Sequence, residues 1–201
     1  FRSRLLPRSR WLPQPADPGD RVLVVRAGKA FPPSHPTTRL CLDLLREALA
    51  GGGVASLADV GCGTGILGLA AAALGVERVV GLDLSGIAAR MTRANARDNH
   101  LDHRVAVAQG STECLRGAFD LVVANLPWEV HLEKVGELHR LAGREGRLIL
   151  SGFRDNQEEP LQELYGRLGW HLNRRAVKDF WHPELPPNIS FTWVAWLLAR
   201  L

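Results

Sequence analysis

The stretch LADVGCGTGILGLAAAALGVERVVGLDL, residues 57–84, holds two short apolar runs separated by glycines and an alanine-rich segment. Residues 57–60 and 78–82 are mostly apolar and strand-like. Residues 66–74, which lie between them, are rich in alanine and leucine, and these residues favour a helix. The stretch therefore predicts a strand, a glycine turn, a helix and a second strand, the repeating unit of a parallel α/β sheet.

The glycine turn and the end of the second strand together predict a ligand site. Gly61, Gly63 and Gly65 carry no Cβ, so the backbone can come close to a ligand there. Asp83 ends the second strand, about 20 positions after Gly61, where a carboxylate can accept hydrogen bonds from ribose hydroxyls. We therefore expect a ligand that contains a nucleoside, bound at the carboxyl edge of the sheet.

The spacing of these glycines disfavours a dinucleotide. The pyrophosphate fingerprint is G-x-G-x-x-G, and here Ile66 stands where its third glycine would fall. Asp59 also places negative charge beside the turn, which suits a cationic ligand better than a pyrophosphate. An oxidoreductase that uses a nicotinamide cofactor (NAD) is therefore a disfavoured alternative.

The rest of the chain continues the alternation of strands and helices. Further strands are expected at residues 21–26, 104–108, 121–124, 147–150, 171–177 and 190–198. Further helices are expected from Thr37 or Thr38, as the cap, to about residue 50, and at residues 85–99, 129–141 and 156–168. The last two strands have no helix between them and predict an antiparallel hairpin. The predicted fold is α/β, with a mostly parallel seven-stranded sheet, helices on both faces and this hairpin at the end.

Residues 1–20 are rich in Pro, Arg and Ser, and we expect a linker or surface arm before a domain of residues 21–201. The net charge of +4 is a mild basic excess, part of which lies in this arm. Contact of the arm with nucleic acid therefore stays open. No apolar run approaches the ~20 residues that span a bilayer, so we expect no membrane partner.

The cysteines and histidines show no pattern of a bridge or a metal site. Cys41, Cys62 and Cys114 are odd in number and far apart, which argues against a disulfide framework. That usage favours a reducing intracellular compartment, taken here as the cytoplasm. The seven histidines lack the spacing of a zinc site, and we expect no metal.

The segment DVGCGTGILGLAAAALGVERVVGLDLS resembles motif I and the acidic strand of class I S-adenosylmethionine-dependent methyltransferases. The segments GKAFPPSHPTTRLCLDLL and FDLVVANLPW are similar to the PrmA family of ribosomal-protein lysine methyltransferases. That family has an A-F-G-T-G-x-H-x-T-T loop and an asparagine at the end of the fourth strand. The resemblance covers about residue 21 to the C-terminus. It implies a Rossmann-like fold, S-adenosyl-L-methionine as cofactor, and N-methylation of a protein amine such as a lysine.

The resemblance also implies which residues contact the cofactor. The family uses the second threonine of its loop, the first glycine of motif I, the ribose acid and the strand-four asparagine. In this chain they are Thr38, Gly61, Asp83 and Asn125. The remaining residues expected at the cofactor are Asp59, Cys62, Gly63, Gly65, Leu84, Gly110 and Ser111. Of these, we expect Gly110 and Ser111, together with Gln109, to lie near the adenine.

The segment DLVVANLPWEV, residues 120–130, predicts the acceptor side of the site. Its strand ends before Pro127, which cannot donate to a sheet. Asn125 can accept N–H bonds from an amine, and Trp128 offers a face to a planar group or a cation. We expect Asn125, Pro127 and Trp128 to act in catalysis. Asn125 could instead cap a turn, and Trp128 could simply pack on the sheet edge.

NLPW also resembles the Asn-Pro-Pro-aromatic motif of methyltransferases that act on glutamine amides and exocyclic base amines, except that Leu126 replaces the first proline. A nucleic-acid base or protein glutamine is therefore an alternative acceptor.

Two further residues are expected near the substrate. Trp181 lies in the connection between the last two strands, which would form a lid or an ordinary surface loop. His35 could orient a loop or a substrate carboxylate, or be structural. The family loop is glycine-rich between its phenylalanine and histidine, whereas here that stretch is Pro32, Pro33 and Ser34, one residue shorter. The prolines stiffen the loop, which keeps open a cofactor-binding scaffold without catalysis.

Overall fold

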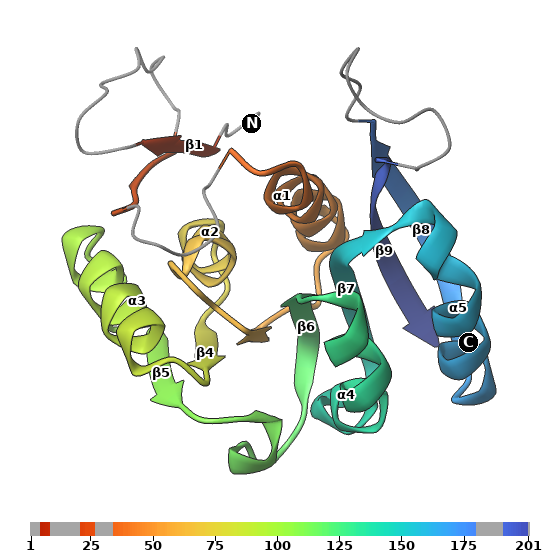
Figure 1. Ribbon diagram of the computed structural model, residues 1–201. Helices are drawn as coiled ribbons and strands as arrows, with labels where there is room; N and C mark the ends of the chain where they lie inside the picture. Colours follow the sequence, from red (N-terminus) through yellow and green to blue (C-terminus); the bar gives the residue numbers. More distant parts are fainter. Residues whose placement is uncertain (1–4, 9–20, 27–33, 180–190, 201) are drawn as a thin grey trace.

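A seven-stranded sheet forms the centre of the molecule (Figure 1). The computed structural model describes residues 5–8, 21–26, 34–179 and 191–200. Along the sheet the strand order is β5-β4-β3-β6-β7-β9-β8. The strands are β3 (Ser56–Val60), β4 (Arg78–Asp83), β5 (Val105–Gln109), β6 (Phe119–Asn125), β7 (Ala142–Arg154), β8 (Trp170–Lys178) and β9 (Trp193–Arg200).

The order of the strands creates a crevice at the centre of the sheet. Strand β3 pairs in parallel with β4 on one side and with β6 on the other. The chain runs from β3 outward to β4 and β5, then returns to start again at β6 on the opposite side. In open α/β sheets ligands bind beyond the carboxyl ends of the strands at such a reversal. The topology therefore predicts a ligand site beyond the carboxyl ends of β3 and β6.

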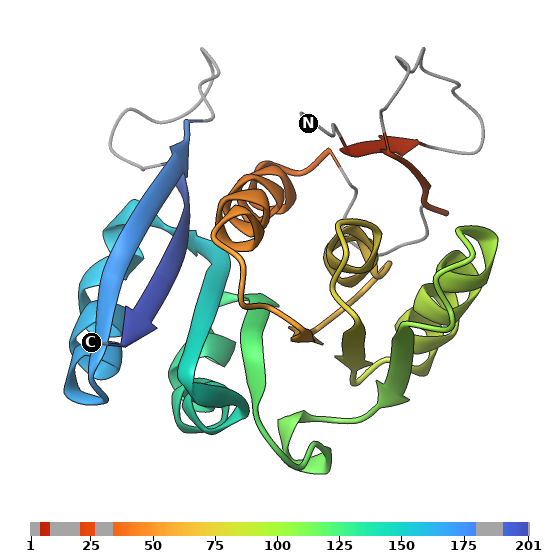
Figure 2. The same ribbon diagram turned by 180° about the vertical axis from the view of Figure 1, so that it is seen from behind.

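The last two strands form the antiparallel hairpin that the sequence predicts. Strand β9 lies between β7 and β8 and is antiparallel to both. Figure 2 shows this pair at the edge of the sheet opposite β5. Because β8 runs parallel to β7, the described ends of the hairpin connection, Lys178 and Trp193, lie at the carboxyl edge. Trp181, Pro183, Pro186 and Pro187 lie outside the described residues.

Helices cover both faces of the sheet. One face carries α1 (Pro36–Ala50), α2 (Ile66–Ala73) and α3 (Gly86–Asp98), and the other carries α4 (Trp128–Leu141) and α5 (Glu158–Arg167). Strand β6 shows why both layers are stable, since alternate side chains point to opposite faces. Leu121 and Val123 join the core under α1 and α2, whereas Val122 and Ala124 join the core under α4 and α5. The mostly parallel α/β architecture of the prediction is confirmed.

Three local features differ from the sequence prediction. His35, rather than Thr37 or Thr38, caps α1, because its ring nitrogen accepts the Thr37 N–H. Strand β7 is much longer than residues 147–150, because β6 and β9 supply backbone partners at both of its ends. Within the predicted arm, β1 (Leu5–Arg8) pairs in parallel with β2 (Arg21–Val24).

Candidate active site

A pocket of about 590 Å³ opens at the carboxyl ends of β3, β4 and β6. Its walls come from the turn after β3, the ends of β4 to β6, and the starts of α3 and α4. Of the residues that the sequence predicts at the site, those in the pocket wall are Thr38, Asp59, Gly61, Cys62, Gly63, Asp83, Leu84, Gly110, Ser111, Asn125 and Pro127. The fold thus brings together residues that are up to about 90 positions apart in the sequence, from Thr38 to Pro127.

The turn between β3 and α2 has a backbone that requires glycine. Gly61, Gly63 and Gly65 have φ values of 71°, 57° and 82°, a left-handed region that L side chains rarely adopt. A Cβ at Gly61 would also overlap the side chain of Leu126. The N–H groups of Gly61 and Cys62 both donate to the carbonyl of Leu82, at 2.8 and 3.0 Å. The turn is therefore tied directly to β4.

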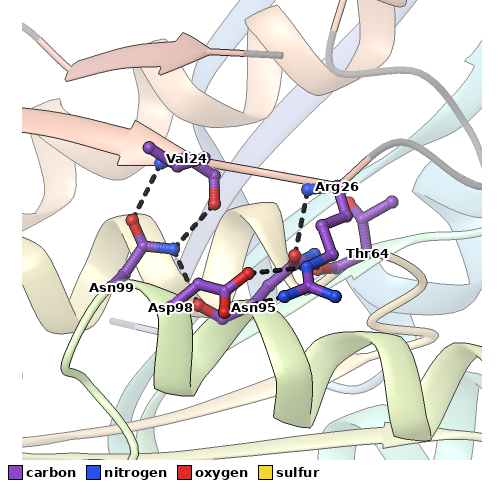
Figure 3. A network of polar contacts seen from close by, with 6 residues as sticks. All are labelled: Val24, Arg26, Thr64, Asn95, Asp98 and Asn99. Atoms are coloured by element: carbon purple, nitrogen blue, oxygen red, sulfur yellow. Dashed lines mark hydrogen bonds and ion pairs between the residues drawn. The ribbon is translucent and has the colours of Figure 1, made fainter. Parts of the chain in front are cut away.

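Two side chains of α3 also hold the glycine turn between β3 and α2. Thr92 Oγ1 donates to the Gly63 carbonyl at 3.0 Å, and Asn95 Nδ2 donates to the Thr64 carbonyl at 2.8 Å. Asn95 is fully buried, and its Oδ1 accepts the N–H of Arg26 at 2.9 Å. One amide thus links the glycine turn to the segment that follows β2 (Figure 3).

Strand β2 and the segment after it have further contacts with α3 and its C-cap. Asn99, the C-cap, pairs with both backbone groups of Val24, the last residue of β2, at 2.8 Å each, as a neighbouring strand would. Arg26 forms a bidentate ion pair with Asp98, with N···O distances of 2.6 and 2.9 Å (Figure 3). The sequence analysis did not identify these α3 residues. The available signal was the spacing of Thr92, Asn95 and Asn99, which places three polar residues on one face of a helix.

Asp83 is oriented before any ligand binds. Its carboxylate accepts the N–H of Gly63 at 3.0 Å and the N–H of Ser85 at 2.8 Å. A carboxylate has about four lone-pair sites, so it retains capacity for hydroxyl donors. Asp83 also lines the pocket, which is the geometry expected of a ribose-binding acid.

Asp59 lies at the floor of the pocket and is 2% exposed. Its Oδ2 accepts the N–H of Gly68 at 2.9 Å. Burial raises the pKa of this carboxyl to about 7, the Gly68 N–H opposes that rise, and the charge of Asp83 adds to it. Asp59 therefore exchanges its proton near neutral pH. A positive charge placed next to it would favour the carboxylate.

The pocket wall as a whole is acidic. Among the described residues that line it, the charged side chains are Asp59, Asp83 and Lys134. Lys134 is 2.7 Å from Glu113, which stands beside the pocket. The ammonium of Lys134 is thus matched by a carboxylate of its own, and the two aspartates set the sign of the remaining charge. Such a wall suits a cation better than a pyrophosphate.

Asn125 and Pro127 form the opposite wall. Asn125 is the last residue of β6, lies opposite Ser151 of β7, and is half-buried. Pro127 is the N-cap residue of α4. Thr38, 2% exposed, reaches the same pocket from the first turn of α1. Asn125, Pro127 and Thr38 therefore line the same pocket as the glycine turn and Asp83.

Trp128 and His35 do not lie in the pocket wall. The half-buried indole of Trp128 donates its Nε1–H to the Gln157 carbonyl at 2.9 Å and packs on the core under α4. An indole N–H needs such a partner when it leaves water. His35 caps α1, and its ring meets Trp193 edge-on with centroids 5.1 Å apart. Burial lowers the pKa of His35.

The two buried thiols, Cys41 and Cys62, have raised pKa values and so show no sign of activation. Cys41 and Cys62 are buried, Cys114 is exposed, and all three are free. Burial raises the pKa of Cys62 to about 12, so this thiol in the pocket wall stays protonated. Within residues 5–8, 21–26, 34–179 and 191–200, no cluster of three metal-ligating side chains is present, and no helix could cross a membrane.

Comparison with solved structures defines the class of the protein. The ribosomal protein L11 methylase of Lactobacillus delbrueckii subsp. bulgaricus matches with a TM-score of 0.82 at 23% identity, over 98% of this chain and 94% of that one. Magnesium protoporphyrin IX methyltransferase of Synechocystis PCC 6803 matches with a TM-score of 0.66 at 19% identity, over 81% and 79% of the two chains. The protein has the Rossmann-like class I methyltransferase fold.

Sequence comparison identifies the family. The model of the family "Ribosomal protein L11 methyltransferase (PrmA)" matches residues 2–183. The Thermotoga maritima protein of that name is 35% identical over 161 residues, 80% of this chain and 60% of the relative. The Syntrophotalea carbinolica protein is 41% identical over 170 residues, 83% of this chain and 55% of the relative. The chain belongs to the PrmA family, which confirms the resemblance, and it spans 60% or less of these two relatives.

Proposed function

We propose that this protein is an S-adenosyl-L-methionine-dependent N-methyltransferase that acts on a protein amine. The observation that carries the proposal is the pocket itself. It combines an acid at the tip of β4, an amide at the tip of β6 and a buried acid beneath the glycine turn. Membership of the PrmA family supports the same chemistry.

The residues of the pocket fit this cofactor. A volume of about 590 Å³ lies within the range of ~300–1,000 Å³ that is usual for small-molecule sites. Asp83 suits the ribose hydroxyls, and the two aspartates suit a ligand with cationic groups. Leu84, Ile87 and Met91 supply apolar surface for a planar base. When bound, S-adenosylmethionine supplies a methyl group activated by a sulfonium.

Methyl transfer to an amine is an in-line displacement, so the protein's task is chiefly positioning and exclusion of water. In the proposed mechanism Asp83 and the glycine turn fix the nucleoside, and Asp59 balances its positive charge. Asn125 accepts an N–H bond of the acceptor and aims the nitrogen lone pair. Pro127 fixes the turn that carries Asn125. The acceptor reacts as a neutral amine, so a lysine must first give its proton to water. The transfer itself then needs little base catalysis, which agrees with a pocket wall without a histidine among its described residues.

For the acceptor we propose a lysine or another amine of a ribosomal protein. The relatives from Thermotoga maritima and Syntrophotalea carbinolica are named for ribosomal protein L11. The rival acceptors, a nucleic-acid base or a glutamine, are suggested by the NLPW motif with its aromatic Trp128 and by the basic arm. The Trp128 indole donates to Gln157 outside the pocket wall, which weakens that rival. The buried free thiols Cys41 and Cys62 agree with a reducing compartment, and we propose the cytoplasm.

Methyl transfer from labelled S-adenosylmethionine into a cell lysate tests the proposal. We expect label in the protein fraction, little in RNA or DNA, and loss of about 100-fold or more of the rate with Asn125→Ala. Label in nucleic acid would overturn the acceptor, and label nowhere would favour the scaffold. Calorimetry with S-adenosylmethionine and with NAD tests the cofactor separately, since tighter binding of NAD would favour the oxidoreductase.

A further inference from the structure

His131, one turn into α4, is fully buried behind the wall that carries Asn125. Its Nε2 lies 2.8 Å from the carbonyl oxygen of Ser151 on β7. The same oxygen accepts the N–H of Leu126 at 2.9 Å. One carbonyl thus receives both a helix side chain and the first backbone N–H after Asn125.

The protonation of His131 follows from its partner. A carbonyl can only accept, so Nε2 must carry the proton and Nδ1 must be bare. Nδ1 is buried and has no hydrogen-bond partner among the residues that the structure describes, and the ring meets Phe153 edge-on with centroids 5.5 Å apart. Burial lowers the pKa of His131 to about 4, so the ring is neutral at physiological pH. The side chain is therefore a fixed neutral donor.

The Leu126 peptide is held on its other sides as well. Gly152, next to Ser151, has φ of 102°, and a Cβ there would overlap the Leu126 carbonyl. The Leu126 side chain in turn fills the space that Gly61 leaves open. Leu126 is thus clamped between β7 and the glycine turn, and Asn125 is the residue directly before it. A shift of the Ser151 carbonyl would move the Asn125 amide.

We propose that His131 is a positioning residue of the acceptor site: its Nε2–H, acting through the Ser151 carbonyl, fixes the Asn125–Leu126 turn in the geometry for methyl transfer. This proposal rests on the proposed function. It assigns to His131 a role that differs from packing, because packing would be served equally by an apolar side chain of similar size.

Three variants separate positioning from packing. His131→Leu keeps the volume and removes the donor. His131→Gln places a donor near the position of Nε2 and should restore the turn. Leu138→Ala is the control, because Leu138 is a fully buried residue two turns further along α4 whose side chain has no hydrogen-bond donor. All are assayed at a temperature where unfolding measurements show each variant folded.

For His131→Leu we expect kcat to fall roughly 10- to 100-fold while the affinity for S-adenosylmethionine, measured by calorimetry, changes less than about threefold. His131→Gln should recover most of the rate, and Leu138→Ala should keep it. The proposal is overturned if His131→Leu and Leu138→Ala lose the same activity, or if His131→Gln is no better than His131→Leu.

Two readouts do not depend on the reaction. Nitrogen NMR of His131 should show a proton on Nε2 and no titration above pH about 5. Hydrogen exchange at the Leu126 amide should accelerate at least about tenfold in His131→Leu and remain unchanged in Leu138→Ala. A proton on Nδ1, or unchanged exchange, overturns the inference. Failure of wild type to bind S-adenosylmethionine or transfer methyl groups would instead overturn the proposed function.

Discussion

The two walls of the pocket are built differently. On the cofactor side, the glycine turn is tied to β4 by two backbone bonds and to α3 by Thr92 and Asn95. On the acceptor side, the turn after β6 is tied to β7 through the Ser151 carbonyl. The polar groups of Trp128 and His35 are engaged away from the pocket. The wall that we propose for the cofactor is thus held by several hydrogen bonds, whereas on the wall that we propose for the acceptor Asn125 is the main candidate for recognition.

This difference predicts that damage to the cofactor wall weakens binding, whereas damage to the acceptor wall slows transfer. Asp83→Asn gives the largest effect on binding. The two carboxylate oxygens of Asp83 accept two backbone N–H groups. The asparagine side chain has only one acceptor oxygen, so its NH2 group must face one of these N–H donors. We expect the Kd for S-adenosylmethionine to rise about 100-fold, equivalent to about 2.7 kcal/mol, with kcat at saturation little changed. A fall in kcat without a change in Kd would contradict the comparison.

Asp59 predicts a pH dependence of binding. Its folded pKa of about 7 means that a cationic ligand must displace a proton in neutral solution. Affinity should therefore rise roughly tenfold from pH 6 to pH 8, with release of up to one proton. Calorimetry in buffers of different ionisation enthalpy measures that proton. Cys41 and Cys62 do not contribute, because burial raises the pKa of each to about 12.

Asp59→Asn should abolish the proton release, whereas Asp120→Asn serves as a control because the pKa of Asp120 is lowered. The Asp59 carboxyl also affects the free energy of unfolding, and the direction of that effect with pH follows from its raised pKa. The pKa of Asp59 in the folded protein lies above its unfolded value of 3.8. The contribution of Asp59 to stability is therefore fully present below pH about 4 and is lost as the pH rises to about 7. Unchanged proton release in Asp59→Asn would exclude this residue as the source.

Asn95→Leu tests whether the turn is held from α3. It removes the donor to the Thr64 carbonyl and the acceptor for the Arg26 N–H. We expect the free energy of unfolding to fall by about 1–3 kcal/mol, because buried backbone groups lose their partners. The Kd for S-adenosylmethionine should rise several-fold. Arg26→Gln, which removes an exposed ion pair, is the control and should leave the free energy of unfolding nearly unchanged.

Trp128→Phe should have the smallest effect. It deletes the hydrogen bond to the Gln157 carbonyl and keeps most of the apolar surface. We expect a loss of about 1 kcal/mol in the free energy of unfolding, measured by denaturant titration. The rate of methyl transfer should stay within about twofold of wild type. A loss of tenfold or more at full folding would place Trp128 at the acceptor after all.

Most of the fold follows from local patterns. The continuous apolar runs around residues 57–60 and 121–124 predict buried strands, and the spacing of glycines predicts where the first one ends. The limits of β7 could not be predicted this way. Its ends at Ala142 and Arg154 depend on partners in β6 and β9, and backbone pairing has no local sequence signature.

The sequence predicts those site residues that lie at the ends of strands. Asp83 and Asn125 each follow an apolar run, and the carboxyl ends of parallel strands meet at one edge. Thr92, Asn95 and His131 could not be found in this way. They lie on helices, and their partners are backbone carbonyls 20 to 31 residues away in the chain.

The amino-acid sequence already contains the chemistry of this pocket, because glycines, acids and amides at strand ends define what the edge of the sheet can bind. The direction in which an aromatic ring points is a different matter. Trp128 turns to Gln157, and His35 turns to cap its own helix, since a half-buried polar atom takes the nearest partner that packing offers. Which partner is nearest depends on how the helices pack on the sheet, and only the tertiary structure decides that.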